Sequence, residues 1–156
     1  MHYANWGGGT HNYEALIPAL TSQTAEVIES SHRQSYQGFN AFKRNIDTSS
    51  MWLTSTETNE YLGYKFSTPQ TMKRILLVAR PRVNKFKIQY SNDGTTWNDL
   101  GNEYDFYNQD VAQLFYQIYD NINPNDISAT QWRLLFTKMI TSSGGGVAKL
   151  QFYKEV

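Results

Sequence analysis

Hydrophobic and polar positions alternate most clearly in the sequence FKIQY, residues 86–90. An alternation with a period of two predicts a half-buried β-strand that has one face toward a core. Asn92-Asp93-Gly94 follows at once and is typical of a tight turn, because Gly94 can adopt the positive φ that such turns require. We therefore predict a hairpin whose second segment is anchored by a buried Trp97, and the rest of the chain must cover its apolar face.

The other segments with strand character are short, and turn residues separate them. They lie at 24–30, 61–66, 72–79, 114–119, 131–138 and 147–153. Residues 15–20 have some helical spacing, but Pro18 interrupts it, and the sequence contains neither a long helical pattern nor an internal repeat. Several short strands with turns between them predict an all-β domain, built as a β-sandwich or jelly roll.

The first part of the chain has a different character. Three consecutive glycines follow Trp6, and glycine runs favour a flexible lead. We predict that residues 1–23 form a lead or linker that packs on the domain, and that residues 24–156 form the domain itself. A second glycine-rich stretch at 142–146 predicts a small flexible loop.

Composition narrows the function classes. The 156 residues fit one domain, and the 14 basic and 14 acidic side chains cancel, so we predict neither a nucleic-acid ligand nor a membrane surface. No apolar run reaches the ~18 residues of a membrane span, and no signal peptide is visible. Cysteine is absent, which excludes disulfides. The 4 Trp, 11 Tyr and 8 Phe suit a β core, where we expect Trp52 and Trp132 to be buried, and also suit platforms for sugars.

The sequence contains no recognisable catalytic constellation. The three histidines, His2, His11 and His32, have no metal-ligand spacing, and no serine lies in a Gly-x-Ser-x-Gly elbow. The Gly144-Gly145-Gly146 run lacks the Lys-Ser/Thr of a phosphate-binding loop. Two carboxylates could serve a glycosidase, but the candidates lie in turns, where a solvated carboxylate is expected. We predict that the domain is not an enzyme.

The order of several short motifs resembles the discoidin-like domains, which include the coagulation-factor C-type domains and the family-32 carbohydrate-binding modules. The resemblance covers about residues 24–153. It is carried by Ala41-Phe42, Met51-Trp52, Leu62-Gly63-Tyr64-Lys65-Phe66, Lys73-Arg74-Ile75, the run Ser91-Asn92-Asp93-Gly94-Thr95-Thr96-Trp97, Trp132-Arg133-Leu134 and Leu150-Gln151-Phe152-Tyr153. It implies an eight-stranded jelly roll that binds glycans, proteins or lipid head groups through loops at one end, without catalysis.

From the resemblance we expect a carbohydrate-binding module that attaches a larger protein or particle to cell-surface polysaccharide. The parent would be an extracellular bacterial enzyme, an adhesin or a phage tail device, which places the domain outside the cell or on a particle surface. The alternative is a protein–protein or structural module that has no glycan ligand. A third, weaker interpretation is a fragment of an enzyme whose catalytic domain lies elsewhere.

The resemblance also raises the question of a metal. Family-32 modules often hold a structural calcium at an Ala-Phe-Asp-Gly loop, aided by a Glu on the last strand. Lys43 and Lys149 stand at those two acidic positions here. Calcium prefers several negatively charged oxygen ligands, so two ammonium groups argue against it, although Asp47 could compensate. We expect no calcium and no other cofactor.

Half of a galactose site is present by resemblance. Leu53 replaces the His of galactose-binding members, whereas Arg82 matches their Arg and Asn84 their Asn. We therefore expect a different specificity, built from neighbouring loops. The predicted ligand-binding residues are Arg80, Arg82, Asn84, His32, Tyr36, Thr54 and Glu57, with Tyr36 as a stacking face and Tyr107 as a weaker candidate for that role.

Basic and acidic residues are segregated in the middle of the chain. Six cations between residues 73 and 87 are followed by five acids between residues 93 and 110. One interpretation is two solvated edges. The other is a basic loop, centred on Arg80, Arg82 and Lys85, that holds an anionic glycan, because Arg offers a fork of donors to a carboxylate or phosphate. Single-site binding through such loops would be roughly micromolar to millimolar, and several copies would supply avidity.

Overall fold

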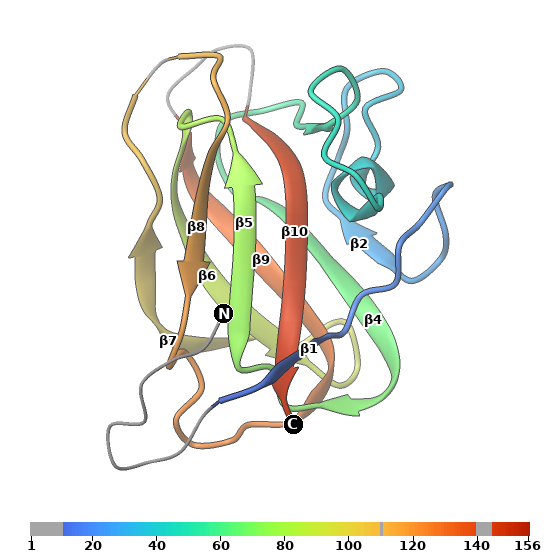
Figure 1. Ribbon diagram of the computed structural model, residues 1–156, viewed down its shortest axis with the longest axis vertical. Coiled ribbons are helices and arrows are strands. Elements are labelled where there is room, and N and C mark those ends of the chain that lie inside the picture. Colours follow the sequence, from blue (N-terminus) through green and yellow to red (C-terminus); the bar gives the residue numbers. More distant parts are fainter. Residues whose placement is uncertain (1–10, 110, 140–144) are drawn as a thin grey trace.

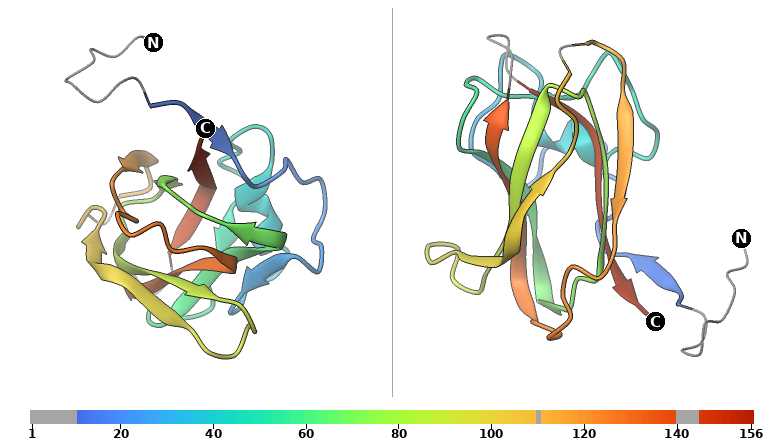
Figure 2. Two further views of the ribbon diagram at one scale, coloured as in Figure 1. Left: turned by 90° about the horizontal axis from the view of Figure 1, so that it is seen from below. Right: turned by 90° about the vertical axis from the view of Figure 1, so that its left-hand side faces the viewer.

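The chain folds into two antiparallel sheets that face each other, as the computed structural model in Figure 1 and the two turned views in Figure 2 show. The structure describes residues 11–109, 111–139 and 145–156, so the glycine-rich lead and most of the predicted 142–146 loop lie outside the described residues. The described residues form ten strands and one short 3-10 helix, η1 (Gly38–Phe42). The all-β sandwich is confirmed, with ten strands in place of eight.

The first sheet has β10 near its middle and is ordered β1-β10-β5-β8, with β3 also pairing with β10. Its strands are β1 (Tyr13–Ala15), β3 (Trp52–Leu53), β5 (Arg74–Ala79), β8 (Phe115–Tyr119) and β10 (Gly146–Glu155). The second sheet is ordered β2-β4-β9-β6-β7. Its strands are β2 (Val27–Glu29), β4 (Glu60–Gln70), β6 (Val83–Ser91), β7 (Asn98–Asp105) and β9 (Ala129–Met139).

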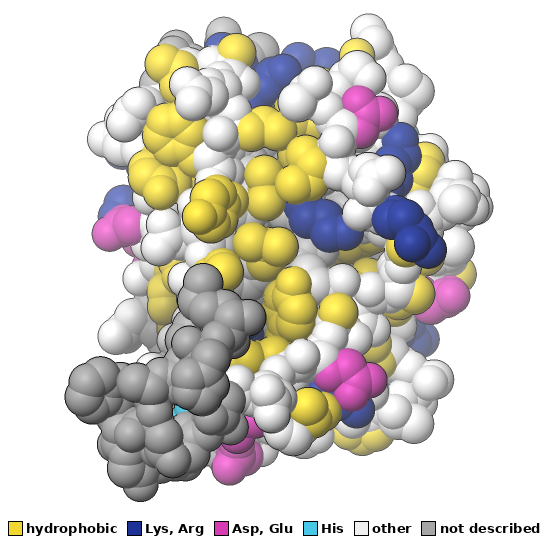
Figure 3. Space-filling view, in the orientation of Figure 1, with side chains coloured by type: hydrophobic (Ala, Val, Ile, Leu, Met, Phe, Trp, Pro, Cys, Tyr) yellow, Lys and Arg dark blue, Asp and Glu magenta, His cyan; other side chains and the backbone are white. Residues whose placement is uncertain are grey.

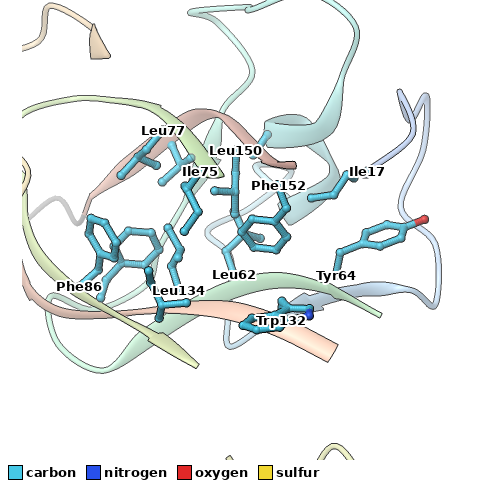
Figure 4. Packing of buried hydrophobic residues seen from close by; sticks show 14 of the residues in the cluster. Ile17, Leu62, Tyr64, Ile75, Leu77, Phe86, Trp132, Leu134, Leu150 and Phe152 are labelled. Atoms are coloured by element: carbon cyan, nitrogen blue, oxygen red, sulfur yellow. The ribbon is translucent and has the colours of Figure 1, made fainter. Parts of the chain in front are cut away.

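The core lies between the sheets, where alternate residues of each strand point inward (Figure 4). Ile75 and Phe152 of the first sheet face Phe86 and Leu134 of the second, and all four side chains are buried. Figure 4 also places Trp132 beneath this layer, in the second sheet. These positions are those whose alternation or apolar run predicted strands, so the hydrophobic pattern determines which face of each strand is buried.

The expected burial of tryptophan is right for two residues and wrong for a third. Trp52 and Trp132 are each 0% exposed, and Trp52 Nε1 donates a hydrogen bond to the Ser31 carbonyl at 2.8 Å. Trp97 is only partly buried. It follows the turn after β6, and the Arg133 guanidinium stacks on its ring at 3.9 Å. A flat, weakly hydrated cation can cover an aromatic face at a surface, so the ring does not need the core.

Cross-strand pairing accounts for much of the charge segregation. The basic strand β6 lies antiparallel to the acidic strand β7, and Lys85 Nζ is 2.7 Å from Asp105 Oδ1. Lys87 Nζ is 3.3 Å from Asp99 Oδ2 on the same pair of strands. Lys85 is therefore part of a charged hairpin rather than of an open basic cluster. Such solvent-exposed pairs contribute little stability, because water and salt screen the attraction between their charges.

Residues before the predicted domain boundary add a strand to the first sheet. Tyr13–Ala15 pairs with β10, although so short a strand leaves no alternation for a sequence to reveal. Gln151 on β10 fixes the segment that follows, because its side chain accepts a hydrogen bond from the Ile17 amide and donates one to the Ile17 carbonyl, both at 2.9 Å. Ile17 then enters the core.

A buried carboxylate holds two loops at one end of the sandwich. Glu60, the first residue of β4, accepts hydrogen bonds from the hydroxyls of Ser30 at 2.7 Å and Ser31 at 2.5 Å. Its second oxygen accepts from the amide of Thr56 at 3.1 Å and the hydroxyl at 2.9 Å. Burial by itself raises the pKa of this carboxyl, but the hydrogen bonds from Ser30, Ser31 and Thr56 outweigh it, so the net pKa lies below the ordinary 4.5.

The close approach of β4 to β9 at Gly63 leads to a first prediction. A Cβ at this position would stand 2.6 Å from the Cα of Arg133, which is backbone that cannot move aside. We expect Gly63→Ala to lower the free energy of unfolding by about 3 kcal/mol, the upper range for overpacking. Urea denaturation measures this. Gly101→Ala, at an exposed position of β7 where the pairing with β6 is irregular and φ is +71°, should cost only about 1 kcal/mol of backbone strain. Equal losses in the two variants would contradict the steric explanation.

The Glu60 network leads to a prediction about acid stability. Because the pKa of the folded carboxyl is lowered, its contribution is complete above pH 4.5 and is lost as the pH falls through the folded value. We expect Glu60→Gln to destabilise the domain by about 1–3 kcal/mol at pH 7, because it removes the negative charge that strengthens these hydrogen bonds. Urea denaturation at pH 7 and pH 3 tests this. The difference in free energy of unfolding between wild type and variant should narrow at pH 3. An equal difference at both pH values would contradict the assignment of this stability to the Glu60 carboxylate.

Candidate functional site

Several loops gather at one end of the sandwich, drawn at the top of Figure 1. The loop from β5 to β6 carries Arg80 and Arg82, and Asn84 is the second residue of β6. The loop from β7 to β8, residues 106–114, reaches the same end, as do the segments that flank β3. The strand directions alone therefore bring most of the predicted ligand-binding residues to one surface.

A short ladder of backbone hydrogen bonds fixes three of these segments relative to one another. The Arg80 amide donates to the Gly146 carbonyl at 3.1 Å. Gly146 pairs with Leu53 in β3, and the Leu53 amide donates to the Tyr36 carbonyl at 3.2 Å. Arg80 and Tyr36, which are 44 residues apart (80 − 36), are thereby connected across two intervening strands.

The loop from β7 to β8 is attached to the other side of the arginine loop. The Phe106 amide donates to the Asn84 carbonyl at 2.8 Å, and the Gln109 amide donates to the Pro81 carbonyl at 3.3 Å. Asn84 also donates through its side-chain amide to Asn108 Oδ1 at 3.2 Å. Asn108 was not foreseen from the sequence, because its partner is distant along the chain and no local pattern marks it.

Three buried polar atoms at this end have no hydrogen-bond partner among the described residues. They are Arg80 Nε, Asn84 Oδ1 and Glu57 Oε1. Asn84 is only 5% exposed, so its carbonyl oxygen is well shielded from bulk water. A buried polar group without a partner costs about 1–3 kcal/mol, and such groups in native proteins call for a water, an ion or a ligand.

The electrostatics of the arginine loop favour an acceptor. The pKa of Arg80 is lowered, first by burial and then by the nearby charge of Arg82, while Tyr36 acts in the opposite direction. The guanidinium remains protonated at any physiological pH, so the two neighbouring charges repel each other. A carboxylate or a hydroxyl oxygen is the kind of acceptor that the Arg80 Nε, which has no partner among the described residues, can bond.

Other predicted site residues serve the protein itself. Thr54 is 0% exposed, and its hydroxyl donates to the Thr56 carbonyl at 2.8 Å and accepts from the Gly145 amide at 3.2 Å, so its hydrogen bonds are made within the protein and shape the loop. His32 Nδ1 lies 3.1 Å from Glu29 Oε1, which directs the imidazole toward β2.

Tyr107 is also engaged within the fold. Its hydroxyl donates to Gln117 Oε1 at 3.2 Å, and its ring packs edge-on against Phe106 and Phe115. The ring therefore fastens the β7–β8 loop to β8 and presents little free face to a ligand. Tyr36, which is partly buried and sits in the backbone ladder, is the better stacking candidate of the two.

A hollow of about 450 Å³ lies away from this end, between residues 19–21 and the loop that contains Lys43, Arg44 and Asp47. Two of its charged groups, Lys43 and Asp47, are engaged within the loop. Asp47 accepts hydrogen bonds from Ser49 and Ser50, and those bonds, with Lys43 nearby, hold its pKa at about 2.

The expected metal position does not fit calcium. Lys149 Nζ donates a hydrogen bond to the carbonyl of Lys43 at 2.6 Å, so an ammonium group already uses an oxygen of that loop. Lys43 Nζ donates to Ser50 Oγ at 2.6 Å. Among residues 11–109, 111–139 and 145–156, no three acidic or histidine side chains cluster in a way that could hold a metal ion. A dication at this point would face two ammonium groups.

Comparisons with known proteins agree with the architecture. A search of curated proteins gives no match. Among solved structures, truncated AlyQ with CBM32 and alginate lyase domains is similar at a TM-score of 0.67 and 11% identity, over 94% of this chain and 34% of that one. This chain thus spans about a third of that protein.

Two isolated modules are similar over most of both chains. The family 32 CBM of C. perfringens NanJ, solved with galactose, has a TM-score of 0.62 and 16% identity, over 82% of this chain and 92% of that one. The CBM32 of AlyQ, solved with 4,5-unsaturated mannuronic acid, has a TM-score of 0.63 and 13% identity, over 83% and 95%. At such identities the likeness is one of fold.

No helix in the described part of the chain is long and apolar enough to cross a membrane. The F5/8 type C domain family matches residues 26–148, which is most of the sequence and includes β2 to β9 and the start of β10. Together with the two-sheet sandwich and the loops gathered at one end, this match shows that the chain belongs to the F5/8 type C, or discoidin-like, domain family.

Proposed function

We propose that this domain binds carbohydrate without catalysis, through the loops that flank Arg80, Asn84 and Glu57. The observation that carries the proposal is the set of buried polar atoms without partners on these three residues. A guanidinium donor, an amide oxygen and a carboxylate oxygen are the groups that recognise sugar hydroxyls by directed hydrogen bonds. The similarity to modules solved with galactose and with 4,5-unsaturated mannuronic acid supports the same conclusion.

Each side chain has a distinct proposed role. Arg80 donates from Nε, which burial shields from competing water, and Asn84 accepts at Oδ1. Glu57 accepts a hydrogen bond from a sugar hydroxyl at Oε1, and Tyr36 offers an aromatic face for the apolar side of a sugar ring. Arg82 supplies a second positive charge at the rim. Because all of this lies on an open end rather than in a deep cavity, single-site binding should be weak, roughly micromolar to millimolar.

The preferred glycan in this proposal carries a carboxylate or phosphate. Arg80 and Arg82 lie close enough for their charges to interact, and the lowered pKa of Arg80 reflects that repulsion after burial. An anionic sugar would place an acceptor against the Nε of Arg80, which has no hydrogen-bond partner among the described residues. The AlyQ module, whose ligand is an unsaturated mannuronic acid, is a precedent on the same fold.

The biological context that we propose is attachment of a larger protein or particle to polysaccharide outside the cell. The similarity to AlyQ, in which a CBM32 accompanies alginate lyase domains, supports such a modular setting. An extracellular enzyme, an adhesin and a phage tail device would all use the domain in the same way, as one of several weak contacts that together give avidity.

We also propose that the domain needs no calcium, because Lys149 performs the structural task at that position. Its ammonium group is half-buried, burial lowers its pKa, and it donates to the Lys43 carbonyl. This contact joins β10 to the loop that follows η1 without any metal ligand. A positive charge fixed to the chain would thus cross-link the same segments that a bound dication could.

The ligand site is tested with Arg82→Ala and a matched control, Arg44→Ala, which removes an exposed arginine beside the other hollow. We expect Arg82→Ala to weaken binding to an acidic polysaccharide such as alginate about tenfold, the effect of one charge-assisted hydrogen bond. Arg44→Ala should bind as wild type does. Isothermal titration measures both, and circular dichroism verifies the fold. Equal affinities for wild type and Arg82→Ala would place the site elsewhere.

The anionic preference has its own test. We expect binding of alginate to weaken several-fold between 20 mM and 200 mM salt, because exposed charges are screened over about 10 Å at 0.1 M. Binding of a neutral galactan should hardly change. Equal affinity for both polymers at both salt concentrations would end the anionic interpretation and leave carbohydrate binding itself intact.

Calcium independence is tested by thermal melting with 5 mM calcium and with excess chelator. We expect melting temperatures within a degree of each other in wild type, since the ammonium groups of Lys43 and Lys149 would repel a cation at this position. Lys149→Met, which removes the ammonium but keeps the stem, should lower the melting temperature in both conditions by breaking the bond to Lys43. A rise of several degrees on adding calcium to wild type would refute the proposal.

A further inference from the structure

The strand β8 is an edge of the first sheet that lacks the usual protection. The edge strands β1, β2 and β7 each carry charge: Glu14 on β1, Glu29 on β2, and Asp99, Glu103 and Asp105 on β7. The short edge strand β3 is uncharged, but its Leu53 is covered by backbone hydrogen bonds with Arg33 and Tyr36. The sequence of β8, FYQIY, contains no charged residue. Natural proteins guard open edges with charges, prolines or bulges, because an unpaired edge is a template for another strand.

The outward face of β8 is apolar as well. Tyr116 is 68% exposed and Ile118 is 45% exposed, although both are large side chains. They pair across the sheet with Val78 and Leu76 of β5. Figure 3 shows hydrophobic side chains gathered on this face of the first sheet, over the region of β5 and β8. Val78 with Tyr116, and Leu76 with Ile118, thus form two short apolar rows across the sheet, and both rows end at the outer edge of β8.

In the part of the chain that the structure describes, the backbone of β8 pairs on one side only. Within residues 11–109, 111–139 and 145–156, its strand partner is β5 on one side, and no other segment forms a backbone hydrogen bond with it. Tyr119 does reach β7, but through its side-chain hydroxyl, which donates to the Asp105 carbonyl at 2.7 Å. The outer amide and carbonyl groups of β8 are thus available to a strand that approaches from the side.

We infer that this edge pairs with β8 of a second copy of the chain, antiparallel and about a two-fold axis through Gln117. In that register Tyr116 faces Ile118 of the second copy, and Phe115 faces Tyr119 of the second copy. The two apolar rows become continuous from one copy to the other, and no like charges oppose each other. The same operation on β7 would bring Asp99, Glu103 and Asp105 of two copies together. Repulsion between these like charges disfavours self-pairing of β7, whereas β8 has no charge to oppose its self-pairing.

A contact of five residues a side is small beside the ~1,200–2,000 Å² of a stable interface, so we expect a weak dimer with a dissociation constant roughly in the micromolar range. Sedimentation velocity from 5 to 500 µM measures it. Ile118→Lys should raise the dissociation constant at least tenfold by placing a charge in the new row. The control Asn102→Lys, which adds the same charge to exposed β7, should leave it unchanged.

The register is tested by cysteine cross-linking, which is unambiguous because the chain has no cysteine. Tyr116→Cys and Ile118→Cys are prepared separately and mixed. Opposite residues of an antiparallel pair lie about 4.5–5.5 Å apart at Cα, within disulfide reach, whereas two copies of residue 116 lie beyond about 7 Å. We expect the oxidised mixture to form at least tenfold more covalent dimer than either variant alone.

The remaining outcomes overturn the inference. Wild type that stays monomeric at 500 µM excludes the dimer, and a dimer whose dissociation constant is the same for wild type and Ile118→Lys lies on another surface. Covalent dimer that forms as readily from a single variant as from the mixture excludes the proposed register. Both substituted side chains are exposed, so circular dichroism and melting should match wild type.

Discussion

The arrangement of the loop end depends on a few backbone hydrogen bonds that continue the first sheet beyond its regular strands. Arg80 bonds to Gly146, which pairs with Leu53, which in turn bonds to Tyr36. Because backbone geometry varies little, these bonds set the spacing of the attached side chains more firmly than side-chain contacts could. Glu60 does the same for the neighbouring serine and threonine loops by collecting their hydroxyls on one buried carboxylate.

Much of the fold was predictable because its signals are local. Strand β6 follows from the alternation of Phe86, Ile88 and Tyr90, and the turn after it from Gly94, which has a φ of +77°. The predictions that failed concern features that depend on a neighbouring strand. Trp97 was expected in the core, but Arg133, 36 residues away (133 − 97), holds it at the surface. Strand β1 was missed because only its pairing with β10 makes it a strand.

The candidate site was predictable to a smaller extent. The sequence could place Arg80, Arg82 and Asn84 in one loop, because their strand context is local. It could not reveal which side chains are already engaged. Thr54 is fully buried and hydrogen-bonded, and His32 is held by Glu29, so both belong to the scaffold. Residues that bind a ligand and residues that shape its loop have the same polar side chains. They are distinguished only by the hydrogen-bond partners that each side chain has in the folded structure.

Strand β10 has a mechanical consequence. It begins at Gly146, in the ladder beneath the candidate site, and ends at Glu155, and the adjacent Val156 amide donates to the Asn12 carbonyl at 3.0 Å. Tension between a ligand on the loops and the chain at residue 156 would run lengthwise along this one strand. Its hydrogen bonds to β5 lie across that direction, so they bear the load together in shear rather than opening one after another. The sandwich would therefore resist unfolding under a load applied in this direction.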